Sequence, residues 1–493
     1  MLPNGTFITN INFTMYSLKL YLFCSLLFLF GCSLPEVVKP KPNIIFLLAD
    51  DMGYGDVNFI GKSTETPNIN RLAAEGVFFN NFYSAAPNCS PSRVGLLTGK
   101  APEKTGMYSY RPANHPMHLP DEESTIAELL KTKGYQTAHF GKWHLGALPH
   151  DPKLNQPQPD QQGFDYSFGT EMNARPSHHN PNNFVRNGKP VGVIEGYACQ
   201  IVAREGIDWL SRRSEKEPFF AYFAFHEPHS VVASPKQLVD KYADMPKKDA
   251  EYLANIDNLD LAIGEILNYL TENNLMENTM IVFSSDNGSY RVKSNGGLRA
   301  GKSSLYEGGI HVPGIVRWHG TTAENKIIET PAGFVDIVPT LCDLLEIDPP
   351  ENLDGTSILP LLKGKLFKRT NPLFWFFYRT VPEIAVRAGD YMVLGLDNDT
   401  LPRTHSFAQG DLEYISSMKI KDYELYNVKN DFSQQEDLFK NHADKKNLKF
   451  LIDNKLNELQ TNMYPWKDLP MYLDRRRRPK SKMAAFGKRN GGI

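Results

Sequence analysis

The chain of 493 residues is 41% hydrophobic and 22% charged, which is typical of a globular protein with a large buried core. Its 54 Lys and Arg residues nearly balance its 56 Asp and Glu residues, for a formal net charge of −2. This balance argues against general nucleic-acid binding, which requires a basic face. Five cysteines are too few for a disulfide-built scaffold, and we expect Cys199 and Cys342 to be buried free thiols.

The N-terminus has the pattern of an export signal. The apolar stretch 21–31 follows Lys19, and a basic residue before about 7–15 apolar residues is typical of a signal peptide. The stretch is too short for a good transmembrane helix. We therefore expect residues 1–31 to be a signal peptide, with Met15 as an alternative start.

The apolar stretch ends at a cysteine, Cys32, in a sequence that resembles a bacterial lipobox. The resemblance implies that Cys32 is acylated, so that the exported protein is a lipoprotein in the periplasm or at the cell surface. Phe30 is bulkier than the residue usually found there, so plain secretion remains an alternative. Residues 32–42 contain prolines and are predicted to be a short tether, and any membrane contact is expected through the lipid anchor alone.

Strands and helices are predicted to alternate along the first two thirds of the chain. The predicted strands are 43–49, 135–140, 217–225 and 279–285, and the predicted helices are 67–75, 122–133 and 249–275. The first strand is apolar on both faces, as in a parallel sheet covered by helices on both sides. The alternation predicts an α/β fold with a large mixed, mostly parallel sheet between helices, and ligands bind at the carboxyl ends of such strands.

A break in pattern near 347–372 divides the chain, whose length allows about two to four domains. We predict a catalytic domain over 43–365 and a smaller C-terminal subdomain over 366–465, with an antiparallel sheet and one helix. Its predicted elements are strands in 373–378, 384–395 and 423–428 and a helix over 444–461. The tail 466–493 is basic and glycine-rich and is expected to be disordered.

A short helix is predicted directly after Cys89, within the sequence Asn-Cys-Ser-Pro-Ser-Arg that starts at Asn88. Ser90 is a good N-cap and Pro91 a good first helical residue, which places Cys89 just outside a helix N-terminus. The helix dipole and Arg93 favour negative charge there. These residues alone allow two interpretations: an activated cysteine or anion site, or a buried structural cysteine.

Polar oxygen-bearing residues follow two of the predicted strands. Asp50 and Asp51 come directly after strand 43–49, and Asp286 and Asn287 come directly after strand 279–285. Three carboxylates and an amide form a hard oxygen cage suited to Ca²⁺ or Mg²⁺, and no His/Cys cluster has zinc spacing. The alternative is that these side chains cap neighbouring helices.

Several motifs together resemble the type I, formylglycine-dependent sulfatases of the alkaline phosphatase superfamily. The most specific is the signature around Cys89, where these positions agree: Cys89, Pro91, Ser92, Arg93, Leu96, Thr98 and Gly99. Further matches lie in 43–56, 141–146, 285–288, 301–313, 385–391 and 424–438. The resemblance extends over about residues 42–465, and the loops are most similar to the arylsulfatase and N-acetylgalactosamine-6-sulfatase branch.

The resemblance implies that Cys89 is oxidised after translation to formylglycine. One hydroxyl of the aldehyde hydrate would attack sulfur and release the alcohol, and the other would then expel sulfate. It also implies one divalent cation, usually Ca²⁺ with Mg²⁺ possible, held by Asp50, Asp51, Asp286 and Asn287 and contacting the modified Cys89. A formylglycine-generating or anaerobic maturation enzyme is then a required partner.

The same resemblance implies roles for three cationic side chains. Arg93 would hold the hydrate and balance negative charge, Lys142 would hold the hydrate and the sulfate, and Lys302 would bind a sulfate oxygen. Considered alone, Lys142 and Lys302 could each be an ordinary solvated lysine.

Two histidines complete the implied machinery. His144 matches the base that regenerates the aldehyde, and His229 matches the acid that protonates the leaving alkoxide. His226 is a competitor for that second role because the loop reads His-Glu-Pro-His-Ser.

The polar stretch 171–187 is rich in Arg, His and Asn. It could bind sugar hydroxyls or a carboxylate through Arg175, His178 or His179, or it could be an ordinary exposed insertion.

We predict a sulfuric ester hydrolase that acts on a sulfated carbohydrate. The alternatives are a phosphodiesterase or phosphonate hydrolase of the same superfamily, and a non-catalytic glycan-binding surface protein.

Overall fold

A computed structural model describes residues 40–378, 383–397, 407–467 and 469. The predicted signal peptide, Cys32 and nearly all of the predicted basic tail lie outside the described residues. Within the described part of the chain, no helix has the length and apolar character needed to cross a membrane.

The main sheet has ten strands in the order β11-β2-β10-β9-β1-β8-β4-β5-β6-β7. In chain order they are β1 (Asn43–Asp50), β2 (Val77–Phe79), β4 (Gln136–Lys142), β5 (Tyr166–Thr170), β6 (Phe184–Arg186), β7 (Lys189–Gly192), β8 (Phe219–Pro228), β9 (Thr279–Ser285), β10 (Gly314–Arg317) and β11 (Lys326–Ile328). The central strands β9, β1, β8, β4 and β5 are all parallel, while β10 is antiparallel to both of its neighbours. The predicted mixed, mostly parallel sheet is confirmed.

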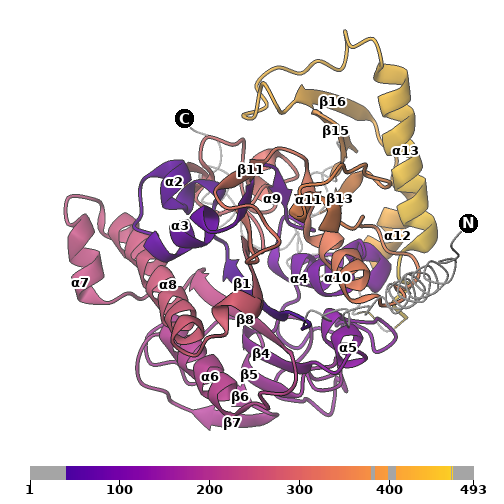
Figure 1. Cartoon of the computed structure of the whole chain (residues 1–493). Coiled ribbons are helices and arrows are strands. Elements are labelled where there is room, and N and C mark those ends of the chain that lie inside the picture. The colour runs from indigo at the N-terminus through magenta and orange to yellow at the C-terminus, as the bar shows by residue number, and fades with distance from the viewer. Residues whose placement is uncertain (1–39, 379–382, 398–406, 468, 470–493) are drawn as a thin grey trace, which may run out of the picture. The chain divides into compact units, whose positions relative to one another are not determined.

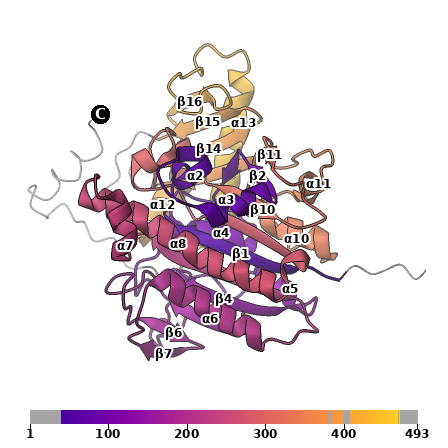
Figure 2. The ribbon, with the colours of Figure 1, turned by 60° about the vertical axis from the view of Figure 1, so that its left-hand side comes forward.

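Strand β1 shows why this sheet is buried on both faces. Its alternate residues Ile44, Phe46 and Leu48 belong to one core, and Ile45, Leu47 and Ala49 belong to the other. Helices cover both faces (Figure 1 and Figure 2). One core contains residues of α4 (Cys89–Thr98), α5 (Ile126–Lys131) and α10 (Ile337–Leu345); the other contains residues of α3 (Pro67–Ala74), α6 (Ala198–Arg212) and α8 (Lys247–Glu272).

A separate four-stranded antiparallel sheet follows in the C-terminal part, in the order β13-β14-β15-β16. Its elements are β13 (Leu373–Phe377), β14 (Glu383–Ala388), β15 (Tyr391–Leu396), α12 (Gln409–Ser417), β16 (Asp422–Asn427) and α13 (Lys445–Asn462). The segment 384–395 is therefore two strands, which turn at Gly389 with φ +61°. Helix α13 contacts β14 and β15 (Figure 1).

The remaining elements are short. They are α2 (Asn58–Gly61), β3 (Phe82–Tyr83), α7 (Lys236–Val239), α9 (Glu307–Ile310), β12 (Ala332–Gly333), α11 (Leu359–Leu362) and the 3-10 turns Tyr54–Asp56, Pro102–Thr105, Asp240–Tyr242, Met276–Asn278, Val292–Asn295 and Phe334–Asp336. Helix α5 is shorter than the predicted 122–133 because a reciprocal cap between Thr125 and Glu128 starts it at Ile126.

Candidate active site

The carboxyl ends of β1, β4 and β9 place the predicted polar residues at one edge of the sheet. Asp50 is the last residue of β1, and Lys142 is the last residue of β4. The chain leaves β1 through Asp51, whose φ is +66°. Its backbone N–H donates to Asp286 Oδ1 at 3.1 Å, and Asn287 Nδ2 donates to Asp51 Oδ1 at 2.7 Å. The four predicted oxygen donors therefore meet at one point.

Helix α4 brings Cys89 to the same point, but its start differs from the prediction. The N-cap is Asn88 and Cys89 is the first helical residue, so the predicted N-cap at Ser90 is wrong. The Ser90 hydroxyl instead accepts a hydrogen bond from the backbone N–H of Arg111 at 2.9 Å. Cys89 thus lies inside the first turn, and all ten residues of the helix are buried.

Cys89 has charged neighbours on more than one side. Lys302 Nζ lies 3.2 Å from its Sγ, and Asp51 Oδ1 lies 4.0 Å from it. Burial raises the pKa of the thiol to about 12, although Lys142 and Lys302 oppose this rise. Burial therefore favours the neutral thiol of the unmodified side chain over the thiolate.

Three cationic side chains pair with the three carboxylates. Arg93 donates to Asp286 Oδ2 through Nε at 3.0 Å and Nη2 at 2.8 Å, and its Nη1 donates to the Lys142 carbonyl at 2.8 Å. Lys142 Nζ donates to Asp50 Oδ2 at 2.6 Å. Lys302 Nζ donates to Asp51 Oδ1 at 2.6 Å and to Oδ2 at 2.8 Å. The cationic and anionic side chains are thus matched in number.

The carboxylates differ in how the site affects them. Burial raises the pKa of Asp286 to about 7, and repulsion by Asp50 adds to the rise. The pKa of Asp50 lies well below its usual value. Burial alone would raise this pKa, but nearby cations, led by Lys142, outweigh the effect of burial. When two buried carboxylates lie close together, each raises the pKa of the other unless nearby positive charge compensates.

The arrangement fits a hard divalent cation. Asp50 Oδ1 and Asn287 Oδ1 are buried and have no hydrogen-bond partner among the described residues. Ligand atoms of Asp50, Asp51, Cys89 and His229 all lie within 4.8 Å of one another. Carboxylate and amide oxygens are the ligands that Ca²⁺ and Mg²⁺ prefer, so these side chains can hold either ion.

His229 faces the site, whereas His226 is held elsewhere. His229 Nε2 lies 3.5 Å from Asp51 Oδ2, and the ring is 19% exposed. The Ser230 carbonyl lies 2.7 Å from His229 Nδ1, which places a hydrogen on Nδ1 and leaves Nε2 toward the site. His226 is fully buried, and its Nε2 is hydrogen-bonded to Thr170 Oγ1 at 2.8 Å. Strand β8 continues beyond the predicted 217–225 to Pro228 and carries His226 into the interior.

His144 lies just past the end of β4, with a φ of +61°. Its Nε2 is hydrogen-bonded to the Arg111 carbonyl at 2.8 Å. Its Nδ1 is buried and has no hydrogen-bond partner among the residues described. This leaves Nδ1 as the ring atom available for proton transfer.

The structure adds residues that no motif identified. Asn173 Nδ2 lies 3.0 Å from His229 Nδ1 and donates to the Ser230 carbonyl at 3.2 Å. Arg111 forms an ion pair with Glu171. The only available signal for Asn173 and Glu171 was their place in the polar stretch 171–187. His178, in the same stretch, is fully buried and is not exposed to a ligand.

Cys199 and Cys342 are buried and free, as predicted. Cys199 is in α6, where its backbone N–H donates to Glu227 Oε1 at 3.0 Å. Cys342 is in α10 and belongs to a hydrophobic core. Cys89 is therefore the one free cysteine, among the residues that the structure describes, that lies beside the carboxylate cluster.

Family models and known proteins match most of the chain. The sulfatase model matches residues 42–347, and the model for the N-sulphoglucosamine sulphohydrolase C-terminal region matches residues 300–462. Human N-acetylgalactosamine-6-sulfatase is 34% identical over 368 residues, 68% of each chain. Human arylsulfatase A is 32% identical over 415 residues, 76% of each chain. The solved structure of Ps i-CgsB in complex with k-i-k-neocarrahexaose has a TM-score of 0.72 and 28% identity, covering 86% of this chain and 94% of that chain.

Proposed function

The chain belongs to the sulfatase family and is a sulfuric ester hydrolase, and we propose that it removes sulfate from a sulfated carbohydrate by means of a formylglycine made from Cys89 and one divalent cation. One observation carries the mechanism. Cys89 lies at the N-terminus of α4, with Lys302 Nζ at 3.2 Å from its Sγ and the carboxylate cluster beside it.

The charge of the site supports a bound divalent cation. The three carboxylates and the three cationic side chains of the site balance one another. A sulfate monoester adds one negative charge, so a balanced site offers it little net attraction. A bound divalent cation polarises the ester and stabilises negative charge that develops in the transition state. Asp50, Asp51, Asp286 and Asn287 would hold it.

Residues of the chain supply the nucleophile, hold the carboxylates and bind the sulfate. Formylglycine supplies a hydrated aldehyde, whose hydroxyl is a nucleophile that a buried neutral thiol does not provide. Arg93 holds the Asp286 carboxylate in place, and Lys142 holds the Asp50 carboxylate. Lys302, closest to the side chain of residue 89, binds a sulfate oxygen.

Two histidines move the protons in this proposal. His229 Nε2 gives a proton to the oxygen of the leaving alcohol, while the Ser230 carbonyl holds Nδ1–H. His144 Nδ1 takes the proton from a hydroxyl of residue 89 as sulfate departs, while the Arg111 carbonyl holds Nε2–H. Each ring is therefore oriented by a backbone carbonyl, which accepts the hydrogen of one ring nitrogen and leaves the other nitrogen for proton transfer.

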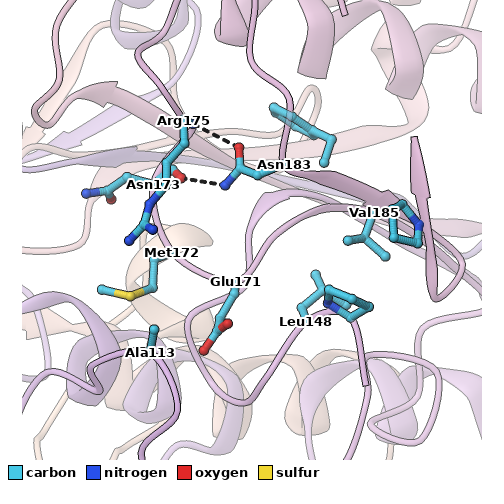
Figure 3. Close-up of a pocket in the computed structure, with 11 residues that line it drawn as sticks. Ala113, Leu148, Glu171, Met172, Asn173, Arg175, Asn183 and Val185 are labelled. Atoms are coloured by element: carbon cyan, nitrogen blue, oxygen red, sulfur yellow. Dashed lines mark hydrogen bonds between the residues drawn. The ribbon is translucent and has the colours of Figure 1, made fainter. Parts of the chain in front are cut away.

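The relatives support a carbohydrate substrate. One is named for removing a 6-sulfate from N-acetylgalactosamine, and one solved structure contains a neocarrahexaose. A cavity with a mixed apolar and polar lining (Figure 3) includes Asn173, whose Nδ2 lies 3.0 Å from His229 Nδ1, and such a lining suits a sugar.

The C-terminal part supports the loop that carries Lys302. Arg299 Nη1 donates to Tyr426 Oη at 2.8 Å and to the Gln434 carbonyl at 2.9 Å. The backbone N–H of Leu305 donates to Glu383 Oε2 at 2.8 Å. We therefore propose that residues 366–465 are a closing subdomain that positions the Lys302 loop of the catalytic domain 43–365.

Mass spectrometry of the Cys89 peptide tests the proposed nucleophile. Conversion of the thiol to an aldehyde lowers the mass of that peptide, and the protein purified after co-expression with a maturation enzyme should carry it. Turnover of an aryl sulfate should then exceed turnover of the matching aryl phosphate. An unconverted, fully active protein, or a clear preference for phosphate, contradicts the proposal.

Export as a lipoprotein is a separate proposal, because Cys32 lies outside the described residues. It predicts that the mature protein begins at Cys32 and incorporates labelled fatty acid. A mature protein that lacks lipid and is found in the medium supports plain secretion instead.

A further inference from the structure

A cavity of about 240 Å³ opens beside the candidate active site. We call it the loop pocket. It is lined by Ala113, Leu148, Pro149, Glu171, Met172, Asn173, Arg175, Asn183, Phe184, Val185 and Pro190. Figure 3 shows these side chains around one space, with Leu148 and Val185 across from the 171–175 segment. A mixed apolar and polar lining is typical of a small-ligand site, and this volume is below the roughly 300–1,000 Å³ of a complete one.

The loop pocket shares its wall with the proposed proton donor. Asn173 lines the pocket, and its Nδ2 lies 3.0 Å from His229 Nδ1. Glu171 also lines the pocket, and its backbone carbonyl accepts a hydrogen bond from the backbone N–H of His144 at 2.8 Å. The loop pocket therefore adjoins both of the histidines that are proposed to transfer protons.

Arg175 lines the loop pocket, and its guanidinium has no ion-pair partner among the described residues. Its backbone is held on both sides: its N–H donates to Asn183 Oδ1 at 2.8 Å, and its carbonyl accepts from the N–H of Asn182 at 2.8 Å. Asn183 Nδ2 in turn donates to the Asn173 carbonyl at 2.9 Å (Figure 3). Within the described part of the chain, no carboxylate forms an ion pair with the Arg175 guanidinium.

Glu171 differs from Arg175 in this respect, because its carboxylate is paired with the buried guanidinium of Arg111. The pocket therefore offers a neutralised carboxylate on one side and an unneutralised guanidinium on the other. A guanidinium of this kind binds carboxylate or sulfate groups through two parallel hydrogen bonds. Because Arg175 is two residues from Asn173, its Cα lies within about 7 Å of the Asn173 Cα.

We infer that the loop pocket binds the sugar portion of the substrate and that Arg175 pairs with a second anionic group on it, a carboxylate or a further sulfate. The inference rests on the proposed function and adds the substrate class: an oligosaccharide with a second negative charge near the sulfate that is removed. Arg175 is thus a specificity residue, and the reacting atoms remain with the Cys89 site.

Three substrates test this inference. They are a monosulfated neutral disaccharide, its counterpart with a uronate ring, and a disulfated neutral disaccharide. The readout is the ratio of kcat/KM for each doubly anionic substrate to that for the neutral one. We expect Arg175→Ala to lower this ratio by about tenfold to a hundredfold. Arg175→Lys should lower it less, because it retains the charge and loses the paired geometry.

Arg212→Ala is the matched control, because this exposed arginine of α6 pairs with Asp208 outside the pocket. It should leave the ratio at the wild-type value. A loss confined to the uronate substrate identifies a carboxylate as the bound group, and a loss confined to the disulfated one identifies a sulfate. An unchanged ratio in Arg175→Ala, or an equal loss on all three substrates, overturns the inference.

Calorimetric binding of the desulfated uronate disaccharide separates this inference from the proposed function, because it requires no turnover. Weaker binding to Arg175→Ala than to wild type supports the pocket even if the protein hydrolyses no sulfate ester. Equal binding to both proteins overturns the pocket even if hydrolysis is normal.

Discussion

The Cys89 site and the loop pocket lie next to each other but are built differently. In the Cys89 site, most of the charged residues come from strand ends and one helix, Lys302 comes from a loop, and each of the three cationic side chains is paired with a carboxylate. In the loop pocket, most of the lining residues come from connecting segments and the others from strands β6 and β7 at one edge of the sheet. Arg175 is exposed and has no ion-pair partner among the described carboxylates. Rigid elements hold reacting groups in place, while loops provide selectivity. Changes in the first region should affect every substrate, and changes in the second should distinguish among them.

The largest effect is expected at Cys89. Cys89→Ala removes the proposed nucleophile, so kcat should fall by about 10⁴-fold or more on every sulfate ester. Cys342→Ala, a buried free cysteine in α10, should retain activity and serves as the matched control. Initial rates together with thermal melts distinguish loss of chemistry from loss of fold. Full hydrolysis by Cys89→Ala contradicts the proposed mechanism.

Removal of the divalent cation should have the next largest effect. Chelation, or Asp51→Asn, should lower kcat by roughly 10³-fold, because several kcal/mol of charge stabilisation are lost. Added Ca²⁺ should raise the Tm of the chelated wild type, with a stabilisation of about 2.7 kcal/mol at a hundred times the Kd. Asp51→Asn should not show this shift.

The control for the cation experiment is Asp390→Asn, which changes an exposed carboxylate of the β14–β15 turn. It should respond to Ca²⁺ as the wild type does. Repeating the titration with Mg²⁺ measures which ion the site prefers. A wild-type protein whose rate and Tm are both insensitive to chelation excludes the proposed cation site.

His229 should matter most for poor leaving groups. His229→Ala should lower kcat by about 10²-fold to 10⁴-fold on a sugar sulfate and by much less on an aryl sulfate, whose alcohol leaves without a proton. His226→Ala is the comparison, because that ring is bonded to Thr170 in the interior. Equal losses on both substrate types in His229→Ala argue against its role as the acid.

The pH profile gives a second readout for His229. Burial lowers the pKa of this histidine below the usual 6.5, although Asp51 and Asp50 oppose the shift. The proton-donating form is therefore lost as pH rises through this lowered pKa, and the sugar-sulfate rate should fall on the alkaline side of it. His229→Ala should lack that decline, whereas His226→Ala should keep it.

The smallest effect is expected from Asn183, whose side chain holds the backbone of the 173–175 segment at both Asn173 and Arg175. Asn183→Ala should raise KM for a doubly anionic oligosaccharide by about threefold to tenfold, because Arg175 is less well oriented. The aryl-sulfate kcat should change less. Asn273→Ala, at the exposed end of α8, is the control. A larger loss on aryl sulfate than on the oligosaccharide would place Asn183 in the support of the catalytic residues instead.

Much of the Cys89 site could be predicted because an apolar run that stops at a polar residue marks the end of a buried strand. The apolar runs before Asp50 and Asp286 identified two strands of one parallel sheet, and the carboxyl ends of such strands meet at one edge. The motif around Cys89 identified a helix. The exact start of that helix could not be predicted, because Ser90 is a favourable N-cap in isolation and its hydroxyl instead binds the backbone of Arg111.

The loop pocket could not be predicted in the same way. Arg175 and His178 occur in one polar stretch and have similar sequence surroundings, yet one is exposed and the other is fully buried. Irregular segments have no periodicity that separates inward from outward positions. The contact between Asn173 and His229 joins residues 56 positions apart, and nothing in the spacing indicates it.

Sequence alone determined the family, the α/β class and the identity of the residues gathered around Cys89, because local patterns and a specific motif encode them. Tertiary structure decided which carboxylate each cation of the site pairs with, which of His226 and His229 faces the site, and that Arg175 has no ion-pair partner among the described carboxylates. These outcomes depend on distances between segments far apart in the chain, and they arise only when the sheet and its loops are packed together.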